Sequence, residues 1–163
     1  MHKINTKEIV TFALLMALTI VMTILVRIPS FHGYINLGDM VLLFAALFLG
    51  KKAGFFVGGL GSALADIIIG YAYYAPITFV VKGLQGYICG WIFQKTGHNK
   101  PFLAAIPAGI FMALGYFIAE SFMYGIAGAA VSIPGNLLQG MVGALGAVLL
   151  QKGIGTKIKR ELH

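Results

Sequence analysis

The chain has 163 residues, of which 59% are hydrophobic and 10% are charged, with a formal net charge of +7. Soluble domains carry about 25% charged residues, so this composition excludes an ordinary soluble domain and predicts an all-α membrane protein. The basic residues stand at the ends of apolar runs and form no single basic face, which excludes a nucleic-acid-binding surface.

Six apolar runs predict six transmembrane helices in a single integral membrane domain over residues 1–163. The runs cover residues 6–26, 37–49, 53–70, 77–93, 101–124 and 134–150. The second run is short for a bilayer core of about 30 Å, and a re-entrant second helix would reduce the count to five spans. The connecting loop 28–36 contains His32, which we expect to be solvated, and residues 125–133 form a loop of small residues.

The distribution of Lys and Arg predicts the topology. With six spans, ten of the twelve basic residues lie on the side that holds both termini. Cytoplasmic loops carry this excess, so the N- and C-termini are expected in the cytoplasm. The ten residues are Lys3, Lys7, Lys51, Lys52, Lys95, Lys100, Lys152, Lys157, Lys159 and Arg160.

Polar side chains within the spans fall in one layer near the outer side. Asp66 and Glu120 lie about 6 Å from the outer ends of their helices, and Lys82 lies about 9 Å deep. The inner halves of the helices are apolar, which predicts a site that is open to the outside and sealed below. We expect the remaining polar side chains to line the same cavity: Asn36, Asp39, Gln85, Asn136 and Gln139.

Lys82 is the one cation inside an apolar run, and such a charge is expected to have a partner. We predict that it pairs with Asp66, Glu120 or both, either in a ligand-binding charge set or in a structural ion pair that joins three helices.

Asn36 and Asp39 either belong to a lid over the site or cap the second helix. Tyr74 and its neighbours stack on a flat ligand or form an interfacial aromatic belt.

Two further patterns concern packing and symmetry. Ala13 and Ala17 lie four residues apart on the first helix, a spacing that allows another helix to approach closely, and we expect an external partner there. Small residues on the third and sixth helices, such as Gly54 and Gly140, are assigned to internal packing.

An offset of 54 residues relates Asp66 to Glu120, and it also relates Lys82 to Asn136 and Gln85 to Gln139, which indicates a faint parallel repeat.

Motifs for enzymes, nucleotide binding and metal binding are absent from the sequence. We therefore expect no catalytic residue, no metal ligand and no cofactor, and no ATP hydrolysis by this chain.

Four segments resemble the substrate-binding S component of energy-coupling factor (ECF) vitamin transporters, in the branch that includes proposed hydroxymethylpyrimidine and pyridoxine carriers. They are GYINLGD (33–39), APITFVVKGLQG (75–86), ESFMYG (120–125) and PGNLLQ (134–139), and the likeness extends over residues 8–152. The resemblance implies six helices, an outward-facing vitamin site capped by the first loop, and a small-residue surface on the first helix. That surface would dock on a transmembrane coupling subunit that two cytoplasmic ATPase subunits drive.

The sequence thus predicts a multi-pass subunit of the bacterial plasma membrane that binds a vitamin or vitamin precursor. The alternatives are a standalone proton-coupled carrier that uses Asp66 or Glu120, and a membrane scaffold without a ligand. Partner binding is assigned to Ala13 and Ala17. Substrate binding is assigned to Asn36, Asp39, Asp66, Tyr74, Lys82, Gln85, Glu120, Tyr124, Asn136 and Gln139.

Overall fold

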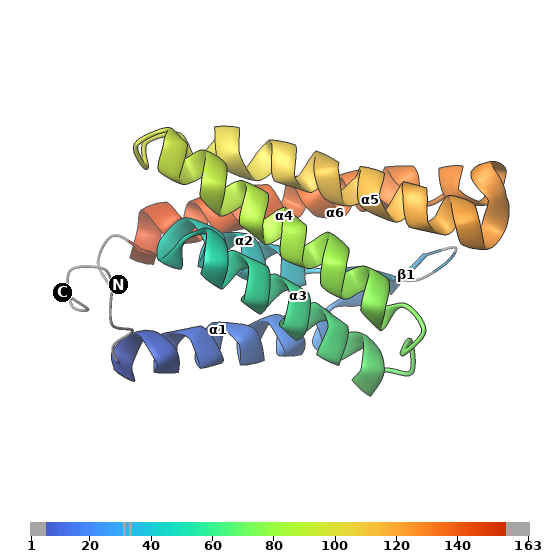
Figure 1. Ribbon diagram of the computed structural model, residues 1–163, viewed down its shortest axis with the longest axis horizontal. Coiled ribbons are helices and arrows are strands. Elements are labelled where there is room, and N and C mark those ends of the chain that lie inside the picture. The colour runs from blue at the N-terminus through green and yellow to red at the C-terminus, as the bar shows by residue number, and fades with distance from the viewer. Residues whose placement is uncertain (1–5, 31, 33, 156–163) are drawn as a thin grey trace.

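The computed structural model describes residues 6–30, 32 and 34–155, which form a helical bundle (Figure 1). The helices are α1 (Thr6–Leu25), α2 (Gly38–Leu49), α3 (Lys51–Ile68), α4 (Ala75–Lys95), α5 (Pro101–Ala130) and α6 (Ile133–Leu150). A π-helical turn, η1 (Gln151–Gly155), follows α6. The prediction of six helices is confirmed.

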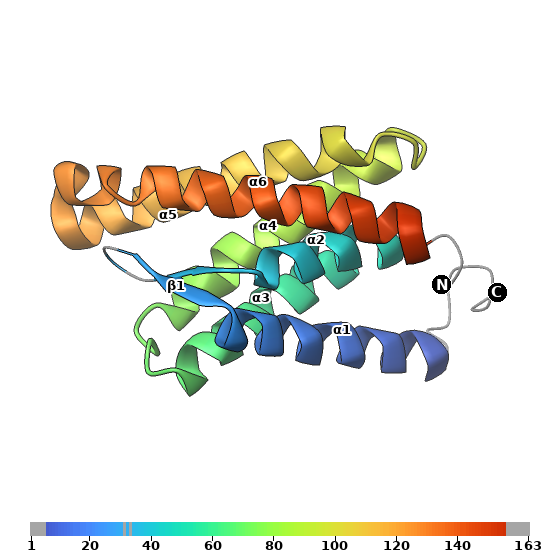
Figure 2. The ribbon, with the colours of Figure 1, turned by 180° about the vertical axis from the view of Figure 1, so that it is seen from behind.

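The predicted loop between the first two helices is instead a small antiparallel hairpin. Its strands are β1 (Arg27–Pro29) and β2 (Tyr34–Asn36), with Ile28 opposite Ile35. Strands of three residues are too short to show an alternating pattern, and Pro29 argues against a strand in the sequence. The hairpin lies at the end of the bundle opposite the first turn of α1 and the last turn of α6, and we call these the hairpin end and the lysine end (Figure 2).

The short helix α2 is the centre of the bundle. Of its 12 residues, ten are buried, from Gly38 to Phe48 with only Met40 less covered. At 1.5 Å per residue, α2 is about 18 Å long and cannot cross a bilayer core of about 30 Å alone. A helix that is apolar on all sides is stable when other helices surround it, and α1, α3, α4 and α6 do so here.

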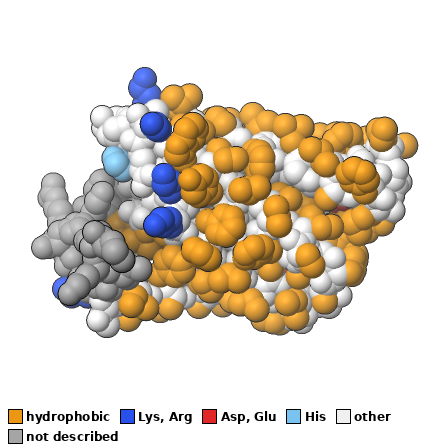
Figure 3. Space-filling view, in the orientation of Figure 1, with side chains coloured by type: hydrophobic (Ala, Val, Ile, Leu, Met, Phe, Trp, Pro, Cys, Tyr) orange, Lys and Arg blue, Asp and Glu red, His pale blue; other side chains and the backbone are white. Residues whose placement is uncertain are grey.

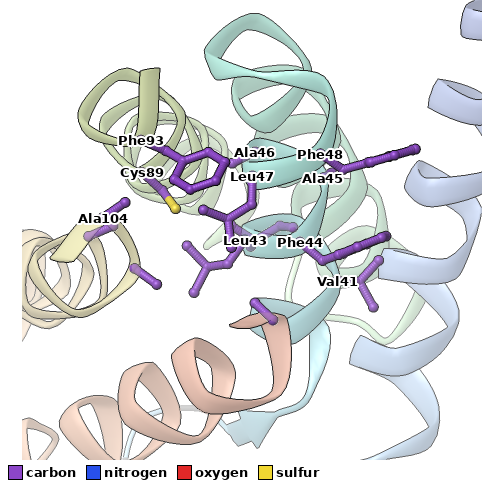
Figure 4. Close-up of a cluster of buried hydrophobic side chains, with 14 of the residues drawn as sticks. Val41, Leu43, Phe44, Ala45, Ala46, Leu47, Phe48, Cys89, Phe93 and Ala104 are labelled. Atoms are coloured by element: carbon purple, nitrogen blue, oxygen red, sulfur yellow. The ribbon is translucent and has the colours of Figure 1, made fainter. Parts of the chain in front are cut away.

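The hydrophobic core is built on α2 (Figure 4). Phe44 and Phe48 stack with ring centroids 5.5 Å apart and point toward α1. On another side of α2, Cys89 and Phe93 of α4 pack against it, together with Ala104 of α5. This apolar core fills the lysine half of the bundle and agrees with the prediction that the inner halves of the helices are apolar.

Glycines let neighbouring helices cross at very short range. A Cβ atom on Gly86 of α4 would lie 2.2 Å from the carbonyl oxygen of Gly54 on α3. A Cβ atom on Gly140 of α6 would lie 3.0 Å from the Cα of Gly109 on α5. Close approach at small residues is a common way for helices to pack in lipid. The assignment of Gly54 and Gly140 to internal packing is confirmed.

Helix α5 extends beyond its predicted end at Tyr124. Gly125 breaks the helical path with φ 76° and ψ 164°, and helical structure then resumes to Ala130. The loop expected over residues 125–133 is therefore mostly helical. Only glycine adopts this backbone conformation readily, so the break coincides with the residue that suggested a loop. The turn between α5 and α6 extends past the α3–α4 connection at the hairpin end (Figure 1).

The face of the bundle in Figure 3 is largely apolar, and blue Lys and Arg side chains gather at its lysine end. Large hydrophobic side chains are also exposed on α1, α3, α4, α5 and α6. Among the described residues, two helical stretches are long and apolar enough to cross a membrane, Pro101–Ala130 and Ile133–Ile154. The number of spans and the side of the termini stay predictions. Of the basic residues used for the topology, Lys3, Lys157, Lys159 and Arg160 lie outside the described residues.

Candidate functional site

A polar cavity opens at the hairpin end of the bundle. Its volume is about 50 Å³ when measured at the centres of water-sized molecules. One water needs about 10–15 Å³ on this scale, so the cavity holds several waters or a small flat molecule. The side chains that line it come from every element near this end: Thr23, Ser30, His32, Tyr34, Ile35, Asn36, Ser62, Asp66, Tyr71, Tyr74, Thr78, Lys82, Tyr116, Glu120, Ser132, Asn136 and Gln139.

The structure brings most of the predicted substrate-binding residues to this cavity. Three of the ten do not line it, namely Asp39, Gln85 and Tyr124. The seven that line it are Asn36, Asp66, Tyr74, Lys82, Glu120, Asn136 and Gln139.

Asp39 lies beneath the cavity and holds several lining side chains in place. Its Oδ1 accepts hydrogen bonds from Lys82 and, at 3.0 Å, from Gln139 Nε2. Its Oδ2 accepts one from Gln85 Nε2 at 2.9 Å. The side chain is 1% exposed, so Asp39 is part of the floor and the interpretation as a lid residue is wrong for it. Because Asp39 accepts hydrogen bonds from both, the orientation of Lys82 and Gln139 is fixed before any ligand arrives.

Lys82 forms its ion pair with Asp39, and both side chains are buried. The prediction that Lys82 pairs with Asp66 or Glu120 is wrong, because neither carboxylate lies within salt-bridge distance of its ammonium group. The sequence placed Asp39 in the first turn of the second helix, which suggested a cap or a lid. Burial of α2 carries that first turn into the protein, where a carboxylate needs a cation.

Asn36 connects the hairpin to the floor. Its backbone N–H donates to Gln139 Oε1 at 2.9 Å, and its Oδ1 accepts from the backbone N–H of Gly38 at 2.8 Å. Thr23 of α1 donates to the same Oδ1 at 3.5 Å. Asn36 therefore joins α1, α2 and α6, and its side chain satisfies the backbone N–H of the residue two positions ahead. The N-cap position of α2 is Leu37, so neither Asn36 nor Asp39 occupies it.

Two tyrosine–carboxylate pairs line this cavity. Tyr34 donates to Asp66 Oδ1, and Tyr74 donates to Glu120 Oε1 at 3.2 Å. The second oxygen of each acid, Asp66 Oδ2 and Glu120 Oε2, is buried and accepts no hydrogen bond. Burial and the hydrogen bond to Asp66 raise the pKa of Tyr34, so this phenol stays protonated and remains a donor.

His32 and Tyr124 fasten the hairpin to the end of α5. Their rings stack with centroids 4.2 Å apart, and His32 Nε2 lies 3.1 Å from the carbonyl oxygen of Gly128. The expectation that His32 is solvated is therefore wrong, since it is half-buried and lines the cavity. Tyr124 contacts the site through His32 and through its hydrogen bond with Tyr74, and its substrate-binding assignment stays a prediction.

Sequence reasoning missed Tyr34, Thr78 and Tyr116 as lining residues. Tyr116 lies in the middle of a long apolar helix, and its hydroxyl donates to Thr78 Oγ1 at 3.1 Å. A tyrosine in that position is normally interpreted as an apolar packing residue. Its position in the sequence could have identified it, because Tyr116 precedes Glu120 by four residues and so lies on the same helix face.

Replacing Tyr34 with phenylalanine is expected to lower the stability of the solubilised protein by about 1 kcal/mol, because Asp66 loses its hydrogen-bond donor in a buried position. The melting temperature in detergent would report the change. Tyr73→Phe is the control, since Tyr73 is 57% exposed and lies outside the cavity lining. Equal melting temperatures for the two variants would show that the Tyr34–Asp66 contact contributes nothing.

An apolar helical bundle with a polar cavity at one end defines a helical membrane protein with an internal polar site. Residues 3–156 match the family described as "ECF-type riboflavin transporter, S component". The chain therefore belongs to this family of membrane transporter components, and the resemblance stated from the sequence is confirmed.

Two relatives extend the comparison. A protein of Pyrococcus woesei described as "Uncharacterized protein in gap 3'region" is 38% identical over 146 residues, which are 87% of this chain and 95% of the relative. The "Thiamine precursor transporter HmpT" of Lactococcus lactis subsp. cremoris is 29% identical over 149 residues, or 90% of this chain and 86% of the relative. The family description and the second relative thus name different ligands, riboflavin and a thiamine precursor.

Among the described residues, no group of three or more His, Cys, Asp or Glu side chains could hold a metal ion. The polar side chains of the cavity are amides, hydroxyls, carboxylates, one imidazole and one lysine. These groups suit hydrogen bonding to a small organic molecule.

Proposed function

We propose that this chain is the substrate-binding subunit of an ECF-type importer and captures a vitamin or vitamin precursor for ATP-driven uptake. Hydroxymethylpyrimidine and pyridoxine are the favoured ligands. The subunit would act as a single multi-pass domain in a bacterial plasma membrane, with both termini in the cytoplasm and the cavity facing outward.

The polar cavity beneath the hairpin is the observation that carries this proposal. It combines phenol rings, two carboxylates and three amides within a bundle that exposes many large hydrophobic side chains. A flat heteroaromatic ring with hydroxyl or amino substituents matches these groups, because the tyrosines offer ring faces and the acids accept hydrogen bonds. The similarity to a thiamine precursor transporter supports the same ligand class.

A thermal-shift panel tests the proposed ligand class. The solubilised protein would be melted alone and with hydroxymethylpyrimidine, pyridoxine, thiamine or riboflavin. A ligand at 100 times its dissociation constant stabilises the folded state by about 2.7 kcal/mol, which gives a clear rise in melting temperature. A rise with one of the first two compounds supports the proposal. A folded protein that responds to none of the four contradicts it.

The proposed partners are a transmembrane coupling subunit and two cytoplasmic ATPase subunits. Ala13 and Ala17 are exposed on α1, while Leu15 and Thr19 of the same helix face the core. The two alanines therefore lie on the surface and are free to contact another helix. Small side chains at this spacing favour association in lipid.

Replacing Ala13 with leucine is expected to weaken assembly with the coupling subunit and uptake by about tenfold, because the larger side chain blocks close helix approach. Ligand binding by the isolated subunit should stay unchanged. Co-purification and uptake assays measure the first two effects, and thermal shift measures the third. Ala127→Leu is the matched control, an exposed alanine on α5. Loss of ligand binding in Ala13→Leu would assign this face to internal packing.

A standalone proton-coupled carrier is the second candidate function, and one observation favours it. Asp66 and Glu120 each present a buried carboxylate oxygen without a hydrogen-bond partner, as proton-carrying groups do. Uptake by the chain alone in vesicles, driven by a pH gradient and without ATPase subunits, would favour this candidate. Uptake only after co-expression with the ATPase subunits would favour the importer.

A further inference from the structure

Asp66 and Glu120 share one arrangement on different helices. Each has one oxygen held by a tyrosine and a second oxygen that accepts no hydrogen bond, and both residues line the cavity. The residues are 4% and 5% exposed, so bulk water does not solvate them freely. The hydroxyl of Ser132, which also lines the cavity, is likewise buried without a partner. Buried polar groups without partners are costly, and three in one cavity indicate that a bound molecule supplies the partners.

The charges around the cavity do not balance. Lys82 is paired with Asp39, which leaves Asp66 and Glu120 without a cation within salt-bridge distance among the described residues. Arg27 on β1 is exposed, and His32 is engaged with Gly128 and Tyr124. Lys82 also attracts Asp66 from beyond salt-bridge distance. The other titratable side chains that interact with the two acids are phenols, which are neutral donors: Tyr34 and Tyr73 with Asp66, Tyr74 with Glu120, and Tyr116 with both.

The tyrosines leave the two acids free to act on a ligand. Each phenol occupies one oxygen and orients the carboxylate, so the remaining oxygen of each acid is a preformed acceptor. Hydrogen bonds between charged acceptors and N–H or O–H donors are stronger than neutral ones, and a cation gains further from a buried negative charge.

We propose that the Asp66–Glu120 pair selects a small heteroaromatic ligand with N–H or O–H donors at two separate points, and that one positive charge enters the cavity with it. Either the ligand itself carries the charge, or a proton from the solvent binds to the ligand and the carboxylates when the ligand enters. This inference rests on the proposed function. It restricts the expected ligands to basic heteroaromatic rings that carry several hydrogen-bond donors. Flat molecules that present only hydrogen-bond acceptors at their ends are disfavoured.

Calorimetric titration of the wild-type protein tests the charge directly. The probe is 4-amino-5-hydroxymethyl-2-methylpyrimidine, at a pH well above the pKa of its ring in water, in several buffers of different ionisation enthalpy. The dependence of the binding heat on the buffer gives the number of protons taken up, and we expect about one per ligand. This readout needs no variant and so does not depend on a mutant that folds.

Variants assign the proton to the two acids. Glu120→Gln and Asp66→Asn remove one negative charge each, and each should lower proton uptake and weaken binding of the probe by about tenfold or more. Ser121→Ala is the control, because Ser121 neighbours Glu120 but bonds to the Phe117 carbonyl and does not line the cavity. It should leave both quantities unchanged.

The outcomes separate this inference from the function on which it rests. Proton uptake that falls in both acid variants supports the inference. Binding of the probe without proton uptake, at equal affinity in wild type and both variants, overturns the inference and leaves the proposed function standing. If neither this probe nor any compound of the vitamin panel binds the folded wild type, the function and the inference are both overturned.

Discussion

Replacing Lys82 with methionine is expected to lower the free energy of unfolding by about 3–5 kcal/mol, because it leaves the Asp39 carboxylate buried without a cation. Both partners are almost completely buried, at 3% and 1% side-chain exposure. The change should also release Gln139 and Gln85 from a fixed geometry, since both donate to Asp39. Denaturation in detergent, followed by tryptophan fluorescence or circular dichroism, measures the loss.

The matched control is Lys95→Met on the same helix, where the lysine is exposed and the effect should be small. Adding Asp39→Asn to Lys82→Met should restore part of the stability, because the stranded charge disappears. A Lys82→Met protein as stable as wild type would contradict the assignment of this ion pair. So would a double variant that is no more stable than the single one.

Replacing Gly86 with alanine is expected to lower the free energy of unfolding by about 3 kcal/mol, at the upper end of overpacking effects. The new methyl group would lie 2.2 Å from the Gly54 carbonyl oxygen, and backbone on both sides cannot move away as a flexible side chain would. Helices α3 and α4 must separate, which also shifts Asp66 and Lys82 in the cavity wall. A lower melting temperature would be the observable.

Gly153→Ala is the control for this change, because a Cβ atom there meets nothing within 4 Å. The melting temperature of this variant should equal that of the wild type. Equal melting temperatures for Gly86→Ala and Gly153→Ala would mean that α3 and α4 do not cross as closely as described.

The helices and the depth of the site could be predicted from the sequence, because apolar runs and isolated polar residues are local signals. Asp66, Lys82 and Glu120 interrupt apolar runs at similar depths, and all three line the cavity. Their partners could not be predicted in the same way. Pairing depends on how the helices are arranged, and the sequence gives no rotation of one helix relative to another.

The central position of α2 carried a signal that depth reasoning did not use. Its residues from Val41 to Phe48 are apolar on every side, which is typical of a helix enclosed by others. With α2 placed at the centre, Asp39 lies buried among the surrounding helices, where it forms the ion pair with Lys82 of α4. The hairpin had no comparable signal, since its two strands have three residues each.

The faint repeat at an offset of 54 residues has a counterpart in the contacts. Gln85 of α4 and Gln139 of α6 occupy equivalent positions, and both donate to Asp39. Gly86 and Gly140 follow them and lie at the two helix crossings described above. Equivalent residues of α3–α4 and α5–α6 therefore make similar contacts, namely a hydrogen bond to Asp39 and a close helix crossing. A parallel repeat stays a prediction.

The central claim is that a ligand occupies the polar cavity. The most direct test is the binding affinity of the Gln139→Ala variant for whichever compound gives the largest rise in melting temperature. Gln139 lines the cavity and bridges Asn36 to Asp39, so its loss should weaken binding by about tenfold. Met141→Ala, at a 67% exposed position on the same helix, should bind like wild type. Unchanged affinity in a folded Gln139→Ala protein, or equal losses in both variants, would contradict a binding site in this cavity.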